Sequence, residues 1–139
     1  MKIIEENMKN KKIRNNLNFT VEKMPNTEIR FRLKIDENTI YSITKSGEKL
    51  AWQKSHYHKN CKEIYYVQKG KMKIITKEKD FVFFRILNKG DKIVVNEDVS
   101  HNVFLYEDTQ ICVLKYGNVS NINWYSDNQL DSICKSIFN

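Results

Sequence analysis

The sequence has 139 residues, enough for one domain with its own hydrophobic core. Hydrophobic residues make up 40% of the chain and aromatic residues 12%, a composition that excludes collagen-like, low-complexity and disulfide-rich proteins. The net charge is +7, but only four of the 24 basic residues are arginines, the side chain best suited to phosphate recognition, so we expect no nucleic-acid partner.

Residues 1–16 are polar and charged without a clear period, and the pattern leaves a mobile arm and a short helix equally open. No apolar run is long enough for a secretory signal or a membrane span, so the sequence predicts a cytoplasmic protein with no membrane partner. Residues 17–139 are then expected to form a single domain.

Strict alternation begins at residues 28–35, where apolar side chains occupy one face and basic side chains the other, as in a half-buried antiparallel strand. Such a strand could also pair at a sheet edge, which suggests a homodimer. Further strands are predicted at residues 39–44, 54–58, 63–68, 71–77, 81–87, 92–95, 101–106 and 110–116. Short, evenly spaced strands predict an all-β sandwich or closed antiparallel barrel with its core at about 28–117.

The C-terminal region changes to a helical period, with apolar residues at i, i+3, i+4 and i+7 from Leu130 to Ile137. Ser126 and Gln129 have the spacing of a capping box. We therefore predict a short helix over about 127–137.

The three histidines of the chain fall in two short segments, His56-Tyr57-His58 with Glu63 soon after, and His101. Residues two apart on a strand share a face, so His56 and His58 direct two imidazoles toward one point. A turn at residues 59–62 would bring Glu63 beside them, and His101 would complete the set from a later strand. These ligands suit one divalent ion of Fe, Mn, Zn, Ni, Co or Cu.

This spacing resembles the two motifs of the cupin superfamily. The first motif is matched by His56-x-His58, four residues, Glu63, six residues and Gly70; the second is matched by Gly90 and, eleven positions later, His101. The sequence departs from the family pattern where Asn96 and Asp98 replace a proline and a glycine, but neither position is a metal ligand in the family. Asn and Asp tolerate left-handed backbone, so the turn can still form.

The resemblance implies a cupin-type jelly roll that holds a divalent metal on His56, His58, Glu63 and His101 and binds a small molecule. It is consistent with a metal-dependent isomerase, oxygenase or lyase acting on a sugar or organic acid derivative, in which Glu63 or Tyr65 moves a proton. Two alternatives remain open: a non-catalytic module that binds or senses a small ligand, and a metal-free sugar isomerase or epimerase.

Alternation places Tyr65, Val67, Val103 and Leu105 inside the barrel, so we expect a mostly apolar cavity. Lys54 shares the parity of His56 and either holds a substrate anion or, the alternative we favour, turns to solvent. Cys61, in the turn before Glu63, is interpreted as incidental rather than as a fifth ligand. Cys112 and Cys134 are interpreted as packing residues, and no structural disulfide is expected.

Overall fold

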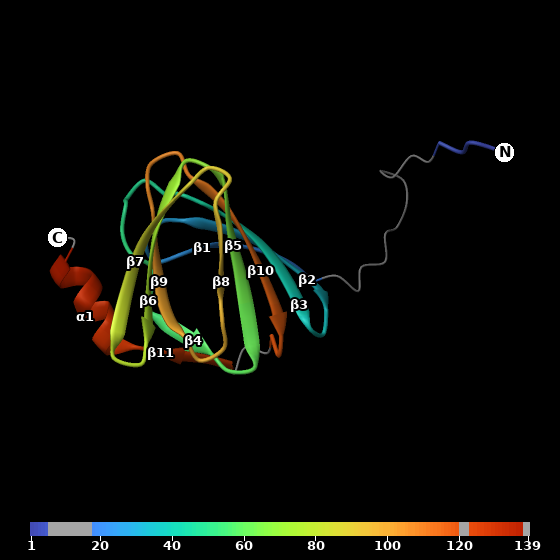
Figure 1. Ribbon diagram of the computed structural model, residues 1–139. Helices are drawn as coiled ribbons and strands as arrows, with labels where there is room; N and C mark the ends of the chain where they lie inside the picture. The colour runs from blue at the N-terminus through green and yellow to red at the C-terminus, as the bar shows by residue number, and fades with distance from the viewer. Residues whose placement is uncertain (6–17, 120–122, 138–139) are drawn as a thin grey trace.

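The computed structural model describes residues 1–5, 18–119 and 123–137, and within them the chain forms two antiparallel β-sheets and one helix (Figure 1). The predicted all-β antiparallel architecture with a short C-terminal helix is confirmed. The interpretation of residues 1–16 falls mostly on positions outside the described residues. No helix in the described ranges has the length and apolar character needed to cross a membrane.

The larger sheet, called here the first sheet, contains six strands. In spatial order they are β1 (Asn18–Lys23), β2 (Ile29–Asp36), β3 (Thr39–Lys45), β10 (Gln110–Gly117), β5 (Cys61–Lys69) and β8 (Lys92–Val95). The second sheet has five strands, in the order β11 (Trp124–Ser126), β4 (His56–His58), β9 (Ser100–Leu105), β6 (Lys71–Glu78) and β7 (Phe81–Asn88).

The two sheets face each other as the layers of a jelly roll (Figure 1). Each sheet keeps its own hydrogen-bonded order in the described part of the chain, so the fold is a sandwich of two sheets rather than a fully closed barrel. Strands β1 and β11 were not among the predicted strands, because neither shows a sustained alternation. The other strands agree with the prediction to within a few residues.

The hydrophobic core lies between the sheets. The inward positions predicted on β5 and β9, Tyr65, Val67, Val103 and Leu105, are buried there, each at most 4% exposed. The same cluster also contains Met72, Ile74, Leu87, Val95, Ile111 and Val113. Tyr65 borders the histidines from this core, since its ring centroid lies 5.9 Å from that of His101.

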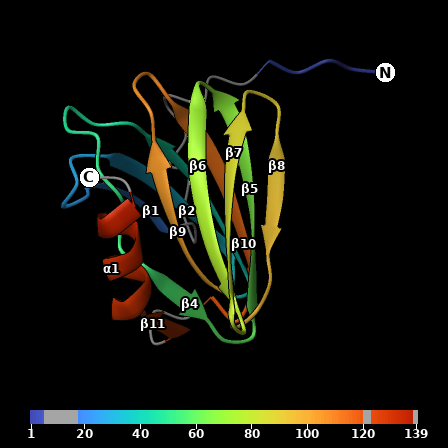
Figure 2. The same ribbon diagram turned by 60° about the vertical axis from the view of Figure 1, so that its left-hand side comes forward.

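Helix α1 (Asn128–Ile137) packs on the outer face of the second sheet, beside β9 (Figure 2). Its buried residues Leu130 and Cys134 contact Ile75, which points outward from β6. The predicted cap at Ser126 is wrong, because Ser126 is the last residue of β11. Instead the side-chain Oδ1 of Asp127 accepts the backbone N–H of Leu130 at 3.0 Å, which is the bond of an N-cap residue.

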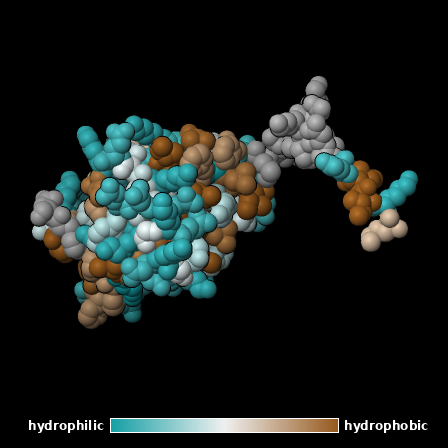
Figure 3. All heavy atoms as spheres, turned by 90° about the horizontal axis from the view of Figure 1, so that it is seen from above, coloured by the Kyte–Doolittle hydropathy of each residue, from teal (hydrophilic) through white to brown (hydrophobic). Residues whose placement is uncertain are grey.

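Strand β2 turns its basic face inward. Its neighbours in register show this: Arg32 lies opposite Ser42 of β3, and Ser42 lies opposite Val113 of β10, a core residue. The apolar residues of the same strand, among them Ile29 at 39% exposed and Ile35 at 47% exposed, therefore lie on the outside. Figure 3 shows apolar side chains interrupting the hydrophilic surface on the side of the domain where Figure 1 places β1 and β2.

Candidate metal centre

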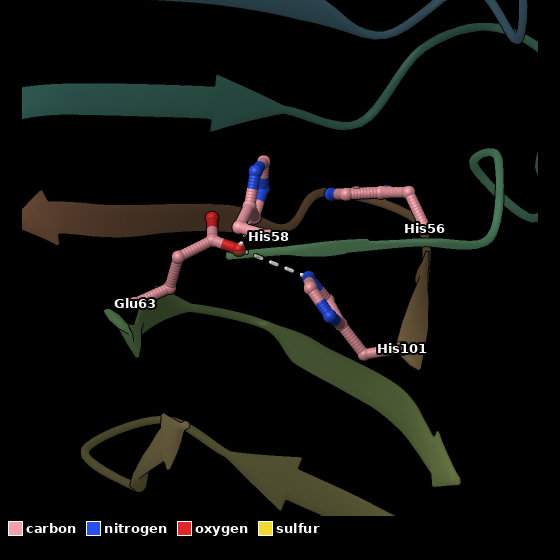
Figure 4. A group of neighbouring side chains, drawn as sticks. All are labelled: His56, His58, Glu63 and His101. Atoms are coloured by element: carbon pink, nitrogen blue, oxygen red, sulfur yellow. Dashed lines mark ion pairs between the residues drawn. The ribbon is translucent and has the colours of Figure 1, made fainter. Parts of the chain in front are cut away.

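The four residues singled out by the sequence come together between the sheets. His56 and His58 lie on β4, and His101 of the adjacent strand β9 is the register partner of His56. Glu63 reaches them from β5 of the opposite sheet (Figure 4). One ligand atom from each of the four side chains lies within 4.8 Å of the ligand atoms of the others.

The carboxylate of Glu63 is close to two of the imidazoles. Its Oε1 lies 3.0 Å from Nε2 of His101 and 3.2 Å from Nε2 of His58. All three atoms are buried, and none has a hydrogen bond of suitable geometry in the structure. Buried polar atoms without partners are costly, so such a group at one point favours a ligand there.

Each imidazole is held by its other nitrogen. Nδ1 of His56 faces the carbonyl oxygen of Lys54 at 2.8 Å, and Nδ1 of His101 faces that of Val99 at 2.9 Å. Nδ1 of His58 faces the carbonyl oxygen of Asn123 at 3.0 Å. A carbonyl oxygen only accepts, so each Nδ1 carries a hydrogen, and in the neutral form of each ring Nε2 would direct its lone pair into the cluster. Histidines that ligate metals are typically held in this way, with the outer nitrogen donating to a protein oxygen.

The spacing of the donor atoms suits an ion. Two atoms that each lie about 2.1 Å from a metal and at right angles to one another are about 3.0 Å apart. The distances from Glu63 Oε1 to the two imidazole nitrogens, 3.0 and 3.2 Å, match adjacent positions of an octahedral ion. The cluster could therefore hold one divalent metal with two positions left for water or another ligand.

Electrostatics also favour the protonation states of His56 and Glu63 that can ligate a metal. Burial lowers the pKa of His56 well below its usual value, and the neighbouring His101 adds to this lowering. Burial alone would raise the pKa of Glu63, but the adjacent His101 and His58 outweigh it, so the pKa of this carboxyl lies well below its usual range. An ionised carboxylate and a neutral His56 are the states that ligate a metal.

A turn without proline or glycine brings His101 into place. Asp98 adopts a left-handed φ of 62°, as the sequence analysis allowed, and its backbone N–H donates to the carbonyl oxygen of His58 at 2.8 Å. This bond ties the turn before β9 to the end of β4. On its other side, β9 is fixed where the Asn102 amide donates to the backbone carbonyl of Gln53 and to the hydroxyl of Ser55, both at 2.9 Å.

Tyr65 contacts the cluster of ligand residues, whereas Cys61 is not part of it. The Tyr65 hydroxyl donates to Oε2 of Glu63 at 3.4 Å. Burial raises the pKa of Tyr65 well above its usual value, and the charge of Glu63 acts in the same direction, so the hydroxyl stays protonated. Cys61 is buried but lies outside the cluster of ligand atoms.

A cavity of about 260 Å³ opens on Glu63, His56 and Tyr65. Apolar side chains line it as expected, among them Met24, Ile40, Val113 and Trp124. Basic side chains line it as well. Lys54 was considered for this role, but Arg30 and Arg32 from β2 and Lys115 from β10 were not expected. Lys54 borders the cavity and is also exposed to solvent, so the preference for a solvent-directed side chain stays a prediction.

Other residues of the site were also missed by the sequence analysis. Asn123 holds the ring of His58 through its backbone oxygen, and it accepts the backbone N–H of Lys59 with its side chain at 3.1 Å. Trp124 stacks on His56, with ring centroids 5.2 Å apart. Their segment gave no motif. The arginines of β2 did give a signal, the alternation at residues 28–35, but which face of that strand turns inward cannot be read from a strand with apolar and basic faces alone.

Comparison with known proteins identifies the architecture. No family model and no curated protein matches the chain. Among solved structures, a single-residue variant of oxalate decarboxylase from Bacillus subtilis superposes with a TM-score of 0.64 at 16% identity, over 80% of this chain and 30% of that chain. KdgF of Halomonas sp. gives 0.61 at 18% identity, over 76% of this chain and 90% of that chain.

Pac13, described as a nucleoside dehydratase, gives a TM-score of 0.65 at 9% identity, over 78% of this chain and 84% of that chain. The chain spans about a third of the oxalate decarboxylase chains it matches, and at these identities the likeness concerns the fold. Together with the two facing antiparallel sheets and the cluster of three histidines and a glutamate, it shows that this chain has the cupin fold.

Proposed function

We propose that His56, His58, Glu63 and His101 bind one divalent metal ion, and that the protein is a metal-dependent enzyme acting on a small oxygen-bearing molecule. The observation that carries the proposal is the arrangement of the imidazoles. Three rings anchored at Nδ1 on backbone carbonyls direct three Nε2 atoms toward one carboxylate, and the buried nitrogens of His58 and His101 have no other partner.

When bound, the ion would supply a Lewis acid with open positions for an oxygen of the substrate. The protein's own groups act around it. Glu63 is a ligand through Oε1, and its Oε2 accepts the Tyr65 hydroxyl. Because the raised pKa keeps Tyr65 protonated, its hydroxyl is suited to donate to a substrate oxygen rather than to act as a base. Tyr65 borders the cavity, where such an oxygen would lie.

A reaction of the lyase, isomerase or oxygenase type is consistent with this site, and the neighbours in fold include a decarboxylase and a dehydratase. The cavity of about 260 Å³ is slightly below the roughly 300–1,000 Å³ of drug-sized ligand sites, which favours a small organic acid or a monosaccharide derivative.

Metal analysis of the purified protein tests the proposal. We expect one equivalent of a divalent ion that is retained on gel filtration, and less than a tenth of that content in His101→Ala. With Mn²⁺ loaded, the relaxation rate of bulk water protons should report an exchangeable bound water, because the four protein ligands leave open positions. A protein that takes up no stoichiometric metal would refute the proposal and favour the metal-free alternative.

The second candidate is a non-catalytic binding module. An enzyme and a binding module would use the same cavity and the same ion, so the two are distinguished by whether a bound small molecule is chemically converted. A small molecule that displaces the metal-bound water and is recovered chemically unchanged after prolonged incubation identifies a binding module, whereas conversion at the metal identifies an enzyme.

A further inference from the structure

The basic side chains of the cavity lie on one continuous inner surface of the first sheet. Arg32 of β2, Ser42 of β3, Val113 of β10 and Tyr65 of β5 follow one another in register across the four strands. One row further along, Lys115 is the register partner of Glu63. The sheet thus presents cations directly beside the carboxylate of the metal cluster.

These cations are only partly neutralised by protein groups. Nη1 of Arg30 lies 3.3 Å from Oε1 of Glu22, and Nη2 of Arg32 lies 3.8 Å from the same atom. One half-exposed carboxylate at the edge of the sheet is therefore shared by two guanidinium groups. Glu63 is committed to the cluster, and Glu28 accepts a hydrogen bond from the Gln53 amide at 2.7 Å.

The cations of the cavity repel one another, and the pKa of Arg32 reflects this repulsion. Burial lowers the pKa of Arg32 and the neighbouring Arg30 lowers it further. Removing cations from water without a full set of counter-charges is unfavourable, and an anion in the cavity would relieve it.

We propose that the substrate is a small organic anion whose carboxylate or phosphate group binds at Arg30, Arg32 and Lys115 while another oxygen of the same molecule faces the metal cluster. This inference rests on the proposed function and adds the substrate class to it. Two arginines at i and i+2 of one strand present their guanidinium groups on the same face, which suits the bidentate recognition of oxyanions. Lys54 adds a further positive charge at the cavity wall.

The test compares lactate, inorganic phosphate and lactamide, the neutral amide of lactate, as ligands of the metal-free and the Zn²⁺-loaded protein. Binding is followed by chemical-shift changes of backbone amides at constant ionic strength. We expect lactate or phosphate to bind at least tenfold more tightly than lactamide in both forms, because charge-assisted hydrogen bonds are worth about that factor each. The tighter of the two anions assigns the group to a carboxylate or to a phosphate.

Variants locate the binding. Arg32→Gln and Lys115→Gln should each weaken anion binding about tenfold, whereas Lys92→Gln, an equal charge change on an exposed residue of β8, should leave it unchanged. Glu22→Gln should strengthen binding, since it removes the competing carboxylate. Arg32→Lys keeps the charge but loses the bidentate contact, so its affinity should lie between those of Arg32→Gln and the wild type, which separates loss of charge from loss of folding.

Equal affinities for lactate and lactamide, or anion binding that is insensitive to Arg32→Gln and Lys115→Gln, would overturn the inference. Its failure is distinguishable from failure of the proposed function. A protein that binds metal but shows no preference for anions keeps the metal centre and loses the anionic substrate, whereas a protein without metal affinity still reports on the basic residues through its metal-free titration.

Discussion

Metal loading should raise the melting temperature by an amount that can be worked out from the structure. The three imidazoles come from the second sheet and the carboxylate from the first, so the complete set of ligands exists only while the sheets face each other. An ion held by all four residues therefore binds the folded protein and not the unfolded chain. Under that condition the ion stabilises the fold by RT ln(1 + [M]/Kd).

Each tenfold rise in free metal above Kd should then add about 1.4 kcal/mol to the free energy of unfolding. The entropy of unfolding is about 2.1 cal/mol/K per residue near 60 °C, which for 139 residues gives about 0.29 kcal/mol/K. The melting temperature should therefore rise by about 5 °C for each decade of free metal. Calorimetry in metal buffers that fix the free concentration over three decades measures this slope directly.

Two variants complete the experiment. Glu63→Gln removes the carboxylate ligand and should flatten the slope over the same range. Cys61→Ser should keep a slope of about 5 °C per decade, because this buried thiol lies outside the cluster, even if its own starting melting temperature differs. A slope near zero in the wild-type protein, or the same slope in Glu63→Gln, would refute the assignment of the ligands.

Other predictions concern the rest of the fold. Burial raises the pKa of Glu28, so its ionised form destabilises the folded state once the pH rises through that raised pKa; Glu28→Gln should melt above the wild type at pH 8 and level with it below about pH 4, as thermal melts across pH will show. Leu130→Ala, at a fully buried position on the inner face of α1, should lower the free energy of unfolding by about 2–5 kcal/mol in urea titrations. Sedimentation at micromolar concentration should detect a homodimer, and Val21→Glu, on the exposed apolar face of β1 opposite Phe31 of β2, should dissociate it; a wild-type protein that sediments only as a monomer contradicts this.

Much of the site could be predicted from the sequence because its ligands lie at short, fixed spacings on strands. The alternation of β4 fixes His56 and His58 on one face, and the glycine and left-handed turns that follow fix where the next strand begins. Gly70 shows this dependence: a Cβ there would clash with Oγ1 of Thr109, and its φ is +81°. Strand alternation and glycine turns depend on local sequence, so they can be predicted without knowledge of the whole fold.

What could not be predicted depends on contacts between distant segments. The face of β2 that turns inward depends on its neighbours in the fold. Its arginines line the cavity that also contains Glu63, and Arg30 pairs with Glu22 of β1. The sequence of β1 has no clear pattern that would predict this strand. The short strand β11 forms only because β4 is there to pair with it. The helix cap moved from Ser126 to Asp127 for the same reason, since pairing with His56 keeps Ser126 extended.

The anchoring of the imidazoles on main-chain oxygens has a consequence for how the protein selects its metal. The rings are oriented by the main-chain carbonyls of Lys54, Val99 and Asn123, and substitution of those three side chains would leave the oxygens in place. Ions of similar radius then meet the same rigid cage and bind in the general order of stability of their complexes. If the proposed ion binds, the metal in the site would be set by which ions a cell makes available, and exchanging the growth medium should exchange the metal without reshaping the protein.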